Sequence, residues 1–316
     1  MKKIAFNLLK IIVSAGLIIY ILFFQVNISE VWAVMASANL GPLLVGAAVM
    51  IGGVILRSVR WQVLLQALEI NVPLPRLVYF YFLGSFFNLF LPTGMGGDAV
   101  KMAKLAQETG QVPESIGVTL VERATGLWVL FILALLALPF SSSYMPPDWM
   151  PLITAVTVGG VIGGFVVMWT PLVPWLGSKI RLPGQASLER FYRSISQLGW
   201  RALGLASLIS LAFDLLLIWL VQLIAVSLGI NLPWSVFFLF TPIISFSLTL
   251  PISIGGLGVR EQTYILLFQT VNVSAEAATA MSLLYYLLNA VLIGLIGGVL
   301  YMIDSVRSAR TAGNRI

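Results

Sequence analysis

The chain has 316 residues, of which 59% are hydrophobic and only 9% are charged. One water-soluble core cannot bury so apolar a composition, so we expect a polytopic membrane protein. The sequence contains no cysteine and no histidine, which excludes disulfides, thiol nucleophiles, histidine acid–base catalysis and His or Cys metal sites.

Long apolar segments predict six full transmembrane helices. They cover residues 4–24, from about 40 to 60, 116–139, 149–169, 203–228 and 277–303, each near the ~20 residues that cross a bilayer. Lys and Arg gather at the ends of these segments, and their bias toward the cytoplasmic side places both termini in the cytoplasm, at the cell membrane. We attribute the net charge of +6 to this bias, and not to nucleic-acid binding.

The motif Leu-Pro-x-x-x-Gly-Gly occurs twice, beginning at Leu91 and at Leu250. Each copy interrupts an apolar segment with helix-breaking residues, namely Pro92, Gly94, Gly96 and Gly97 in the first copy and Pro251, Gly255, Gly256 and Gly258 in the second. We expect two re-entrant pairs of half-helices, over residues 77–97 and 237–258, that enter the membrane from opposite faces.

Matching breaks in the two halves of a membrane protein are typical of internal repeats and indicate a transporter's substrate site. We therefore expect one membrane domain, residues 1–316, with repeat halves of about 1–145 and 146–316 in inverted orientation. The alternative is eight full transmembrane helices, since charge bias weakens in the middle of a chain.

Charged side chains at membrane depth cost free energy and therefore indicate a site or a structural pair. Asp214 lies near the middle of the fifth predicted crossing, either as a proton or cation carrier or as the partner of a buried arginine. Glu122 and Arg123 are adjacent, about 100° apart on the helical wheel, so we expect them to face different neighbours. Asp98 precedes Lys101 at the start of the second half-helix, where it either caps the helix or lines a polar path.

Other candidates suit the binding of an anionic group. In the second copy, glycines precede Arg260 and Glu261, and glycines at a helix start let backbone N–H groups approach a phosphate. Arg57 and Arg60 are expected at the inner membrane interface, either as anchors or as ligands of lipid headgroups. Asn88 can hydrogen-bond within the site or between helices.

Four segments in this order resemble the lysylphosphatidylglycerol synthase transmembrane-region family, a flippase-like membrane domain, over nearly the whole chain. They are residues 57–61, 88–98, 122–127 and 251–261. The resemblance implies translocation of a phospholipid or an isoprenoid-type lipid between leaflets, with the Arg, Asp and Glu positions above lining the path. In two-part members a cytoplasmic domain performs aminoacyl transfer, and this sequence ends shortly after its last apolar segment.

We therefore expect a transporter of a lipid with an anionic headgroup that needs no cofactor or metal. One alternative is a membrane-embedded lipid-modifying transferase or hydrolase with Asp98, Asp214 or Glu261 as base. Against it, the acidic residues occur singly and form no Asp-x-x-Asp pair. The other alternative is an accessory subunit of a partner enzyme.

Overall fold

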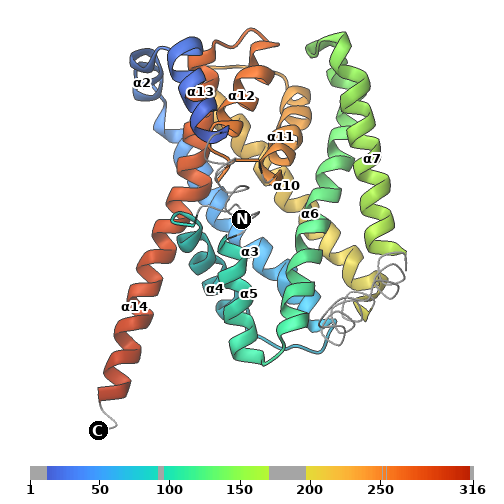
Figure 1. The fold of residues 1–316 in the computed structure, drawn as a ribbon, viewed down its shortest axis with the longest axis vertical. Coiled ribbons are helices and arrows are strands. Elements are labelled where there is room, and N and C mark those ends of the chain that lie inside the picture. The colour runs from blue at the N-terminus through green and yellow to red at the C-terminus, as the bar shows by residue number, and fades with distance from the viewer. Residues whose placement is uncertain (1–12, 92–95, 171–196, 251, 254, 314–316) are drawn as a thin grey trace, which may run out of the picture.

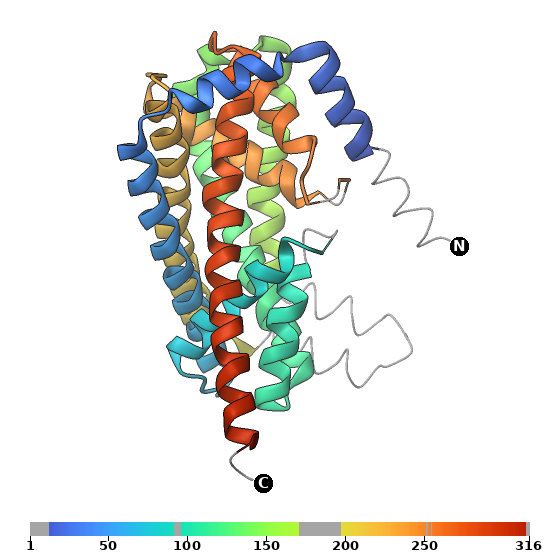
Figure 2. The same cartoon turned by 90° about the vertical axis from the view of Figure 1, so that its left-hand side faces the viewer.

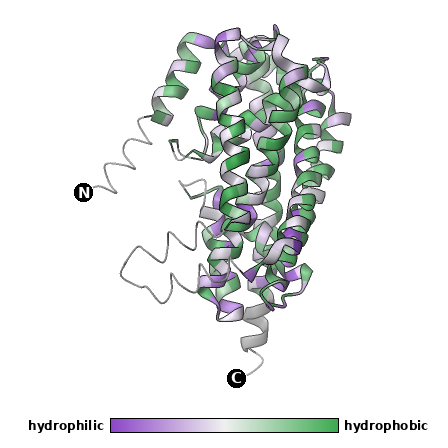
Figure 3. Cartoon of the chain, turned by 90° about the vertical axis from the view of Figure 1, so that its right-hand side faces the viewer, coloured by the Kyte–Doolittle hydropathy of each residue, from purple (hydrophilic) through white to green (hydrophobic). Residues whose placement is uncertain are grey.

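The computed structural model describes residues 13–91, 96–170, 197–250, 252–253 and 255–313, and this part of the chain is helical without strands (Figure 1). Five helical segments are long and apolar enough to cross a membrane: Leu40–Gln66, Val112–Tyr144, Pro147–Trp169, Gly199–Ser227 and Ala275–Val306. Hydrophobic residues cover the length of the long helices, and hydrophilic ones gather mainly toward the two ends (Figure 3). The predicted all-α polytopic membrane protein is confirmed.

These segments contain helices α3 (Leu40–Gln66), α6 (Val112–Ser141), α7 (Met150–Trp169) and α10 (Gly199–Ser227). The last segment joins α13 (Ala275–Tyr286), a π-helical turn η4 (Leu287–Leu292) and α14 (Ile293–Gly313). In Figure 1, α3 and α10 cross the centre of the molecule, α14 runs along one side, and α6 with α7 forms the other.

The first predicted crossing is described only from residue 13 onward. A helix over Val13–Gln25 bends by 86° into α2 (Ile28–Ala36), and the number of candidate spans is six if this bent pair is one span and five if it is not. The Asn27 side chain accepts a hydrogen bond from the Ser29 amide and so caps α2 at the bend. Figure 2 shows α2 lying across one end of the bundle.

Both sequence motifs separate two short helices. The first joins α4 (Leu74–Asn88) to α5 (Gly96–Thr109), and the second joins α11 (Trp234–Thr249) to α12 (Val259–Gln269). At 15 and 16 residues, α4 and α11 span only ~24 Å, which is less than the ~30 Å hydrocarbon core. Three predicted break residues, Pro92, Gly94 and Pro251, lie outside the described part of the chain.

The two broken pairs lie at opposite ends of the bundle, with their breaks facing each other near mid-height (Figure 2). Their packing is reciprocal, because α14 contacts α4 while α6 contacts α11. Close approach depends on glycine: a Cβ on Gly97 would collide with the backbone of Gly84 across the first pair, and one on Gly297 would collide with the backbone of Phe82 in α4. Small residues allow this contact between helix backbones inside a membrane protein.

Candidate functional site

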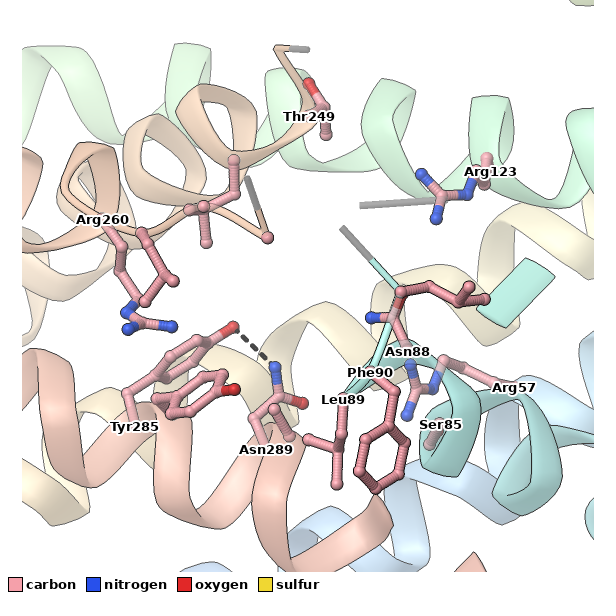
Figure 4. A pocket seen from close by; sticks show the side chains of 17 residues that line it. Arg57, Ser85, Asn88, Leu89, Phe90, Arg123, Thr249, Arg260, Tyr285 and Asn289 are labelled. Carbon is pink, nitrogen blue, oxygen red and sulfur yellow. Dashed lines mark hydrogen bonds between the residues drawn. The ribbon is translucent and has the colours of Figure 1, made fainter. Parts of the chain in front are cut away.

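A cavity of about 440 Å³ lies between the two helix breaks (Figure 4). Its wall combines the C-terminal end of α4, the segment that joins α11 to α12, and the region around η4. The lining residues are Arg57, Ser85, Asn88, Leu89, Phe90, Leu91, Arg123, Leu248, Thr249, Gly255, Gly256, Leu257, Arg260, Tyr285, Tyr286, Asn289 and Ala290. The described residues of this wall include three arginines and no carboxylate, so the cavity favours an anion.

Arg57 differs from the other arginines of the site in its partners. Its guanidinium lies over the rings of Tyr81 and Phe213, at 5.5 and 4.9 Å from the ring centroids. Its Nε is buried without a hydrogen-bond partner, and no ion pair joins it to any described carboxylate. A half-buried cation without an ion-pair partner is stabilised by an anion, which offsets the desolvation of its buried Nε.

A smaller cavity of about 120 Å³ adjoins the first and shares Arg57, Ser85, Asn88 and Arg123 with it. Asp98 and Lys101 line it from the first turns of α5. The Asp98 carboxylate accepts a hydrogen bond from Arg123 Nε and lies 3.4 Å from Lys101 Nζ. Asn88 Oδ1 accepts a bond of 3.3 Å from the Gly97 amide, which ties the two sides of the first break together.

A buried ion-pair network centred on Glu122 lies behind the smaller cavity. The Glu122 carboxylate accepts hydrogen bonds from Arg60 Nη2 at 2.6 Å, from Lys101 Nζ at 2.8 Å and from the Tyr81 hydroxyl. Arg60 also donates to Ser210 Oγ of α10 at 2.8 Å. The network therefore joins α3, α4, α5, α6 and α10.

Arg260 and Glu261 form a second buried cluster at the start of α12. Arg260 donates to Glu261 Oε1 at 2.5 Å and to Ser282 Oγ at 3.1 Å, and its guanidinium lies 4.3 Å from the Tyr286 ring centroid. Glu261 also accepts from the Gly258 amide at 2.8 Å. Gly258 has a φ of 79°, which favours glycine, and it places the α12 N-terminus beside the cavity, where the helix dipole favours an anion.

The structure brings nine of the ten predicted path residues into these two cavities and their two ion-pair clusters. Glu122 and Arg123 face different neighbours, as expected from the helical wheel. Arg57 and Arg60 were expected at the inner membrane interface; the structure shows that Arg57 lines both cavities and that Arg60 is only 5% exposed. The Asp98 carboxylate pairs with two cations, Lys101 and Arg123. Asp214 lies outside both cavity walls.

Sequence reasoning missed several polar residues of the site. Asn289 lies in the π-helical turn η4 and donates to the Tyr285 hydroxyl at 3.2 Å, and π-turns inside long helices frequently occur at functional sites. Its only signal in the sequence is an amide within an apolar segment. No sequence pattern marks Tyr81 or Ser210 as part of the site, because their hydrogen-bond partners lie far away along the chain. Among the described residues, no group of three acidic side chains could hold a metal ion.

A comparison with curated proteins finds no match. A family model described as "Lysylphosphatidylglycerol synthase TM region" matches residues 7–297. The match contains all four segments that carry the resemblance and both cavity walls. The chain therefore belongs to the lysylphosphatidylglycerol synthase transmembrane-region family.

Proposed function

We propose that this protein moves a lipid with a phosphate-containing, anionic headgroup between the leaflets of the cell membrane. The observation that carries the proposal is the cavity between the two helix breaks, with Arg57, Arg123 and Arg260 in its wall. Its polar end suits a phosphate, because arginine guanidinium groups and helix N-termini both bind phosphate oxygens.

Exposed apolar side chains beside the cavity support a lipid over a water-soluble anion. Phe90 is 70% exposed, and Leu91 and Leu257 are also exposed, yet all three contribute to the cavity wall. In a bilayer these side chains contact acyl chains, while a headgroup occupies the polar interior. The cavity thus matches both parts of an amphiphilic ligand.

The orientation we propose follows from charge. At the bundle end that carries α2, the described loops and helix starts hold Glu30, Asp148 and Glu276 without any Lys or Arg. Toward the opposite end, α4 and α10 begin and α5 and α14 end (Figure 1), and the sequence places Arg76, Arg201 and Lys104 near these ends of α4, α10 and α5. The positive-inside bias makes that opposite end cytoplasmic. The α4–α5 and α11–α12 pairs are then re-entrant from the cytoplasmic and the external side respectively.

An inverted internal repeat gives this site a way to face each leaflet in turn. The reciprocal packing of α14 on α4 and of α6 on α11 supports such a repeat. Rocking of one half against the other around a fixed midplane site is the common transport mechanism of inverted-repeat folds.

The site also favours a headgroup without an amine. The three described acidic groups of the cavities and their ion-pair clusters already have cationic partners: Asp98 pairs with Arg123 and Lys101, Glu122 with Arg60 and Lys101, and Glu261 with Arg260. An ammonium group would find no free carboxylate among them. The family description names lysylphosphatidylglycerol, whose headgroup carries amines. Because the site offers such amines no free carboxylate among these groups, its favoured ligand is a lipid without an amine, such as phosphatidylglycerol.

The test is leaflet exchange of labelled lipids in proteoliposomes, with Arg57→Gln as the main variant. A hydrogen bond to a charged group contributes about 1.5–3 kcal/mol, so exchange of labelled phosphatidylglycerol should fall by about 10- to 150-fold. Arg76→Gln is the matched control, because Arg76 forms an exposed ion pair with Glu108 away from the cavities. Unchanged exchange in Arg57→Gln, with the protein folded, would remove Arg57 from the path.

Two further measurements separate the alternatives. Labelled lysylphosphatidylglycerol should exchange more slowly than phosphatidylglycerol, and equal rates would contradict the selection against amines. Mass spectrometry of the lipids distinguishes transport from catalysis, since a transporter changes only the sidedness of a lipid, whereas a transferase or hydrolase changes its mass.

A further inference from the structure

Asp214 is a buried carboxyl group that the proposed lipid path does not use. It lies within α10, is 1% exposed, and its Oδ2 is buried without a hydrogen-bond partner. Neither of its oxygens is within ion-pair distance of a described cation. A carboxylate with a full negative charge in this position would cost several kcal/mol, because neither water nor a bonded cation compensates it.

Among the described residues, Arg60 is the cation whose charge acts on Asp214. Ser210, one turn earlier on the same face of α10, accepts the hydrogen bond from Arg60 Nη1, so Arg60 lies beside this face. The helices packed on α10 are α3, α6, α11 and α13. Their charged and titratable residues are Arg57 and Arg60 on α3, Glu114, Glu122 and Arg123 on α6, none on α11, and Glu276, Tyr285 and Tyr286 on α13.

Arg60 therefore stands between two acidic groups and is bonded to one of them. Its Nη2 donates to Glu122 at 2.6 Å, and Glu122 would keep Lys101 and Tyr81 as partners if Arg60 turned away. The other cation on α3, Arg57, lies over the Phe213 ring and forms no ion pair with Asp214 in this arrangement. The two carboxyl groups thus compete for one guanidinium. When Asp214 is protonated it is neutral, so Arg60 stays bound to Glu122.

We propose that Asp214 is a proton-binding site that couples lipid movement to the proton gradient. With Asp214 protonated, Arg60 binds Glu122 and holds α3 against α6, which is the arrangement seen here. When Asp214 releases its proton, Arg60 turns toward the new carboxylate and the contact between α3 and α10 tightens, while the clamp on α6 loosens. One proton bound and released per cycle thereby moves the elements that wall the cavity. The coupling of proton binding to lipid movement rests on the transport function proposed above. The protonation of Asp214 does not depend on that function.

Infrared spectroscopy of the purified protein tests protonation without any transport assay. At neutral pH the wild type should show the carbonyl stretching band of a protonated carboxylic acid, and Asp214→Asn should lack it. Asp148→Asn, which changes an exposed acid outside the bundle core, is the matched control and should keep the band. In Arg60→Gln the band should persist to higher pH than in the wild type, because the deprotonated form has lost its cation. Absence of the band in the wild type, or its survival in Asp214→Asn, would overturn the proposal.

Proteoliposomes with an imposed pH gradient test coupling. One proton per lipid can shift the leaflet ratio of labelled phosphatidylglycerol by up to about tenfold per pH unit. The wild type should approach such a shift, whereas Asp214→Asn should exchange lipid to an even distribution or not at all. A wild type that exchanges lipid evenly under the gradient refutes the coupling. If no lipid moves in either protein, the transport function itself fails, and the infrared result still decides whether Asp214 holds a proton.

Discussion

Glu122→Gln is the substitution that most directly tests the buried ion-pair network. Glutamine has nearly the same shape, so the change removes a charge without opening a cavity. It leaves Arg60 and Lys101 buried, with side chains 6% and 3% exposed, and without their shared carboxylate. Breaking a buried ion pair in this way costs about 3–5 kcal/mol. Lys101 keeps Asp98 at 3.4 Å and the face of the Tyr81 ring at 3.9 Å, which favours the lower end of the range.

The cost can be converted into a melting temperature. An unfolding entropy of ~2.1 cal/mol/K per residue over 316 residues makes 3–5 kcal/mol equal to a decrease of about 5–8 °C. Thermal unfolding in detergent, followed by tryptophan fluorescence, measures it. Glu108→Gln is the matched control, since Glu108 is also salt-bridged but 37% exposed, and an exposed pair contributes at most ~1 kcal/mol. Equal melting temperatures for the two variants would refute the conclusion that the buried Glu122 carboxylate stabilises the protein through Arg60 and Lys101.

Three other predictions follow from packing, charge pairing and topology. Gly297→Leu should destabilise the contact of α14 with α4 by at least 1–3 kcal/mol. Gly163→Leu is the control, because a side chain at that position would meet open space. Equal melting temperatures for the two variants would contradict the close contact at Gly297. Asp98→Arg should abolish lipid exchange, and the double variant Asp98→Arg with Arg123→Asp should restore part of it. If the double variant shows no recovery, the ion pair between Asp98 and Arg123 does not position Arg123. Because the native chain has no cysteine, Ser143→Cys should react with an impermeant thiol reagent from outside intact cells and Gln107→Cys only after permeabilisation, and the reverse pattern would invert the proposed orientation.

Several features of the fold could be predicted from the sequence because they depend on local properties of the chain. Hydropathy and segment length indicate the long helices, and Pro and Gly indicate where apolar segments break. The helical wheel separated Glu122 from Arg123 correctly, since neighbours along a helix always point in different directions. The family resemblance was also visible in the sequence and is confirmed over residues 7–297.

Other features depend on contacts between distant segments. The bond from Arg60 to Glu122 joins positions 62 residues apart, and that from Arg60 to Ser210 joins positions 150 apart. Charge counts along the chain placed Arg57 and Arg60 at the membrane interface, because a cation at the end of an apolar segment usually lies there. That rule does not reveal the partners inside the bundle, where packing of α3 against α10 puts Arg57 over Phe213 and into the cavity wall.

The sequence by itself determined that this is an α-helical membrane protein with two interrupted segments and polar residues near each interruption, since composition and helix-breaking residues act locally. Only the tertiary structure decided that the interruptions face each other, that Glu122 rather than Asp214 holds Arg60, and that Arg57 has no carboxylate partner among the described residues. The physical reason is that the partners of a buried charge are chosen by which helices pack together, and helix packing depends on side-chain and glycine contacts between segments far apart in the chain.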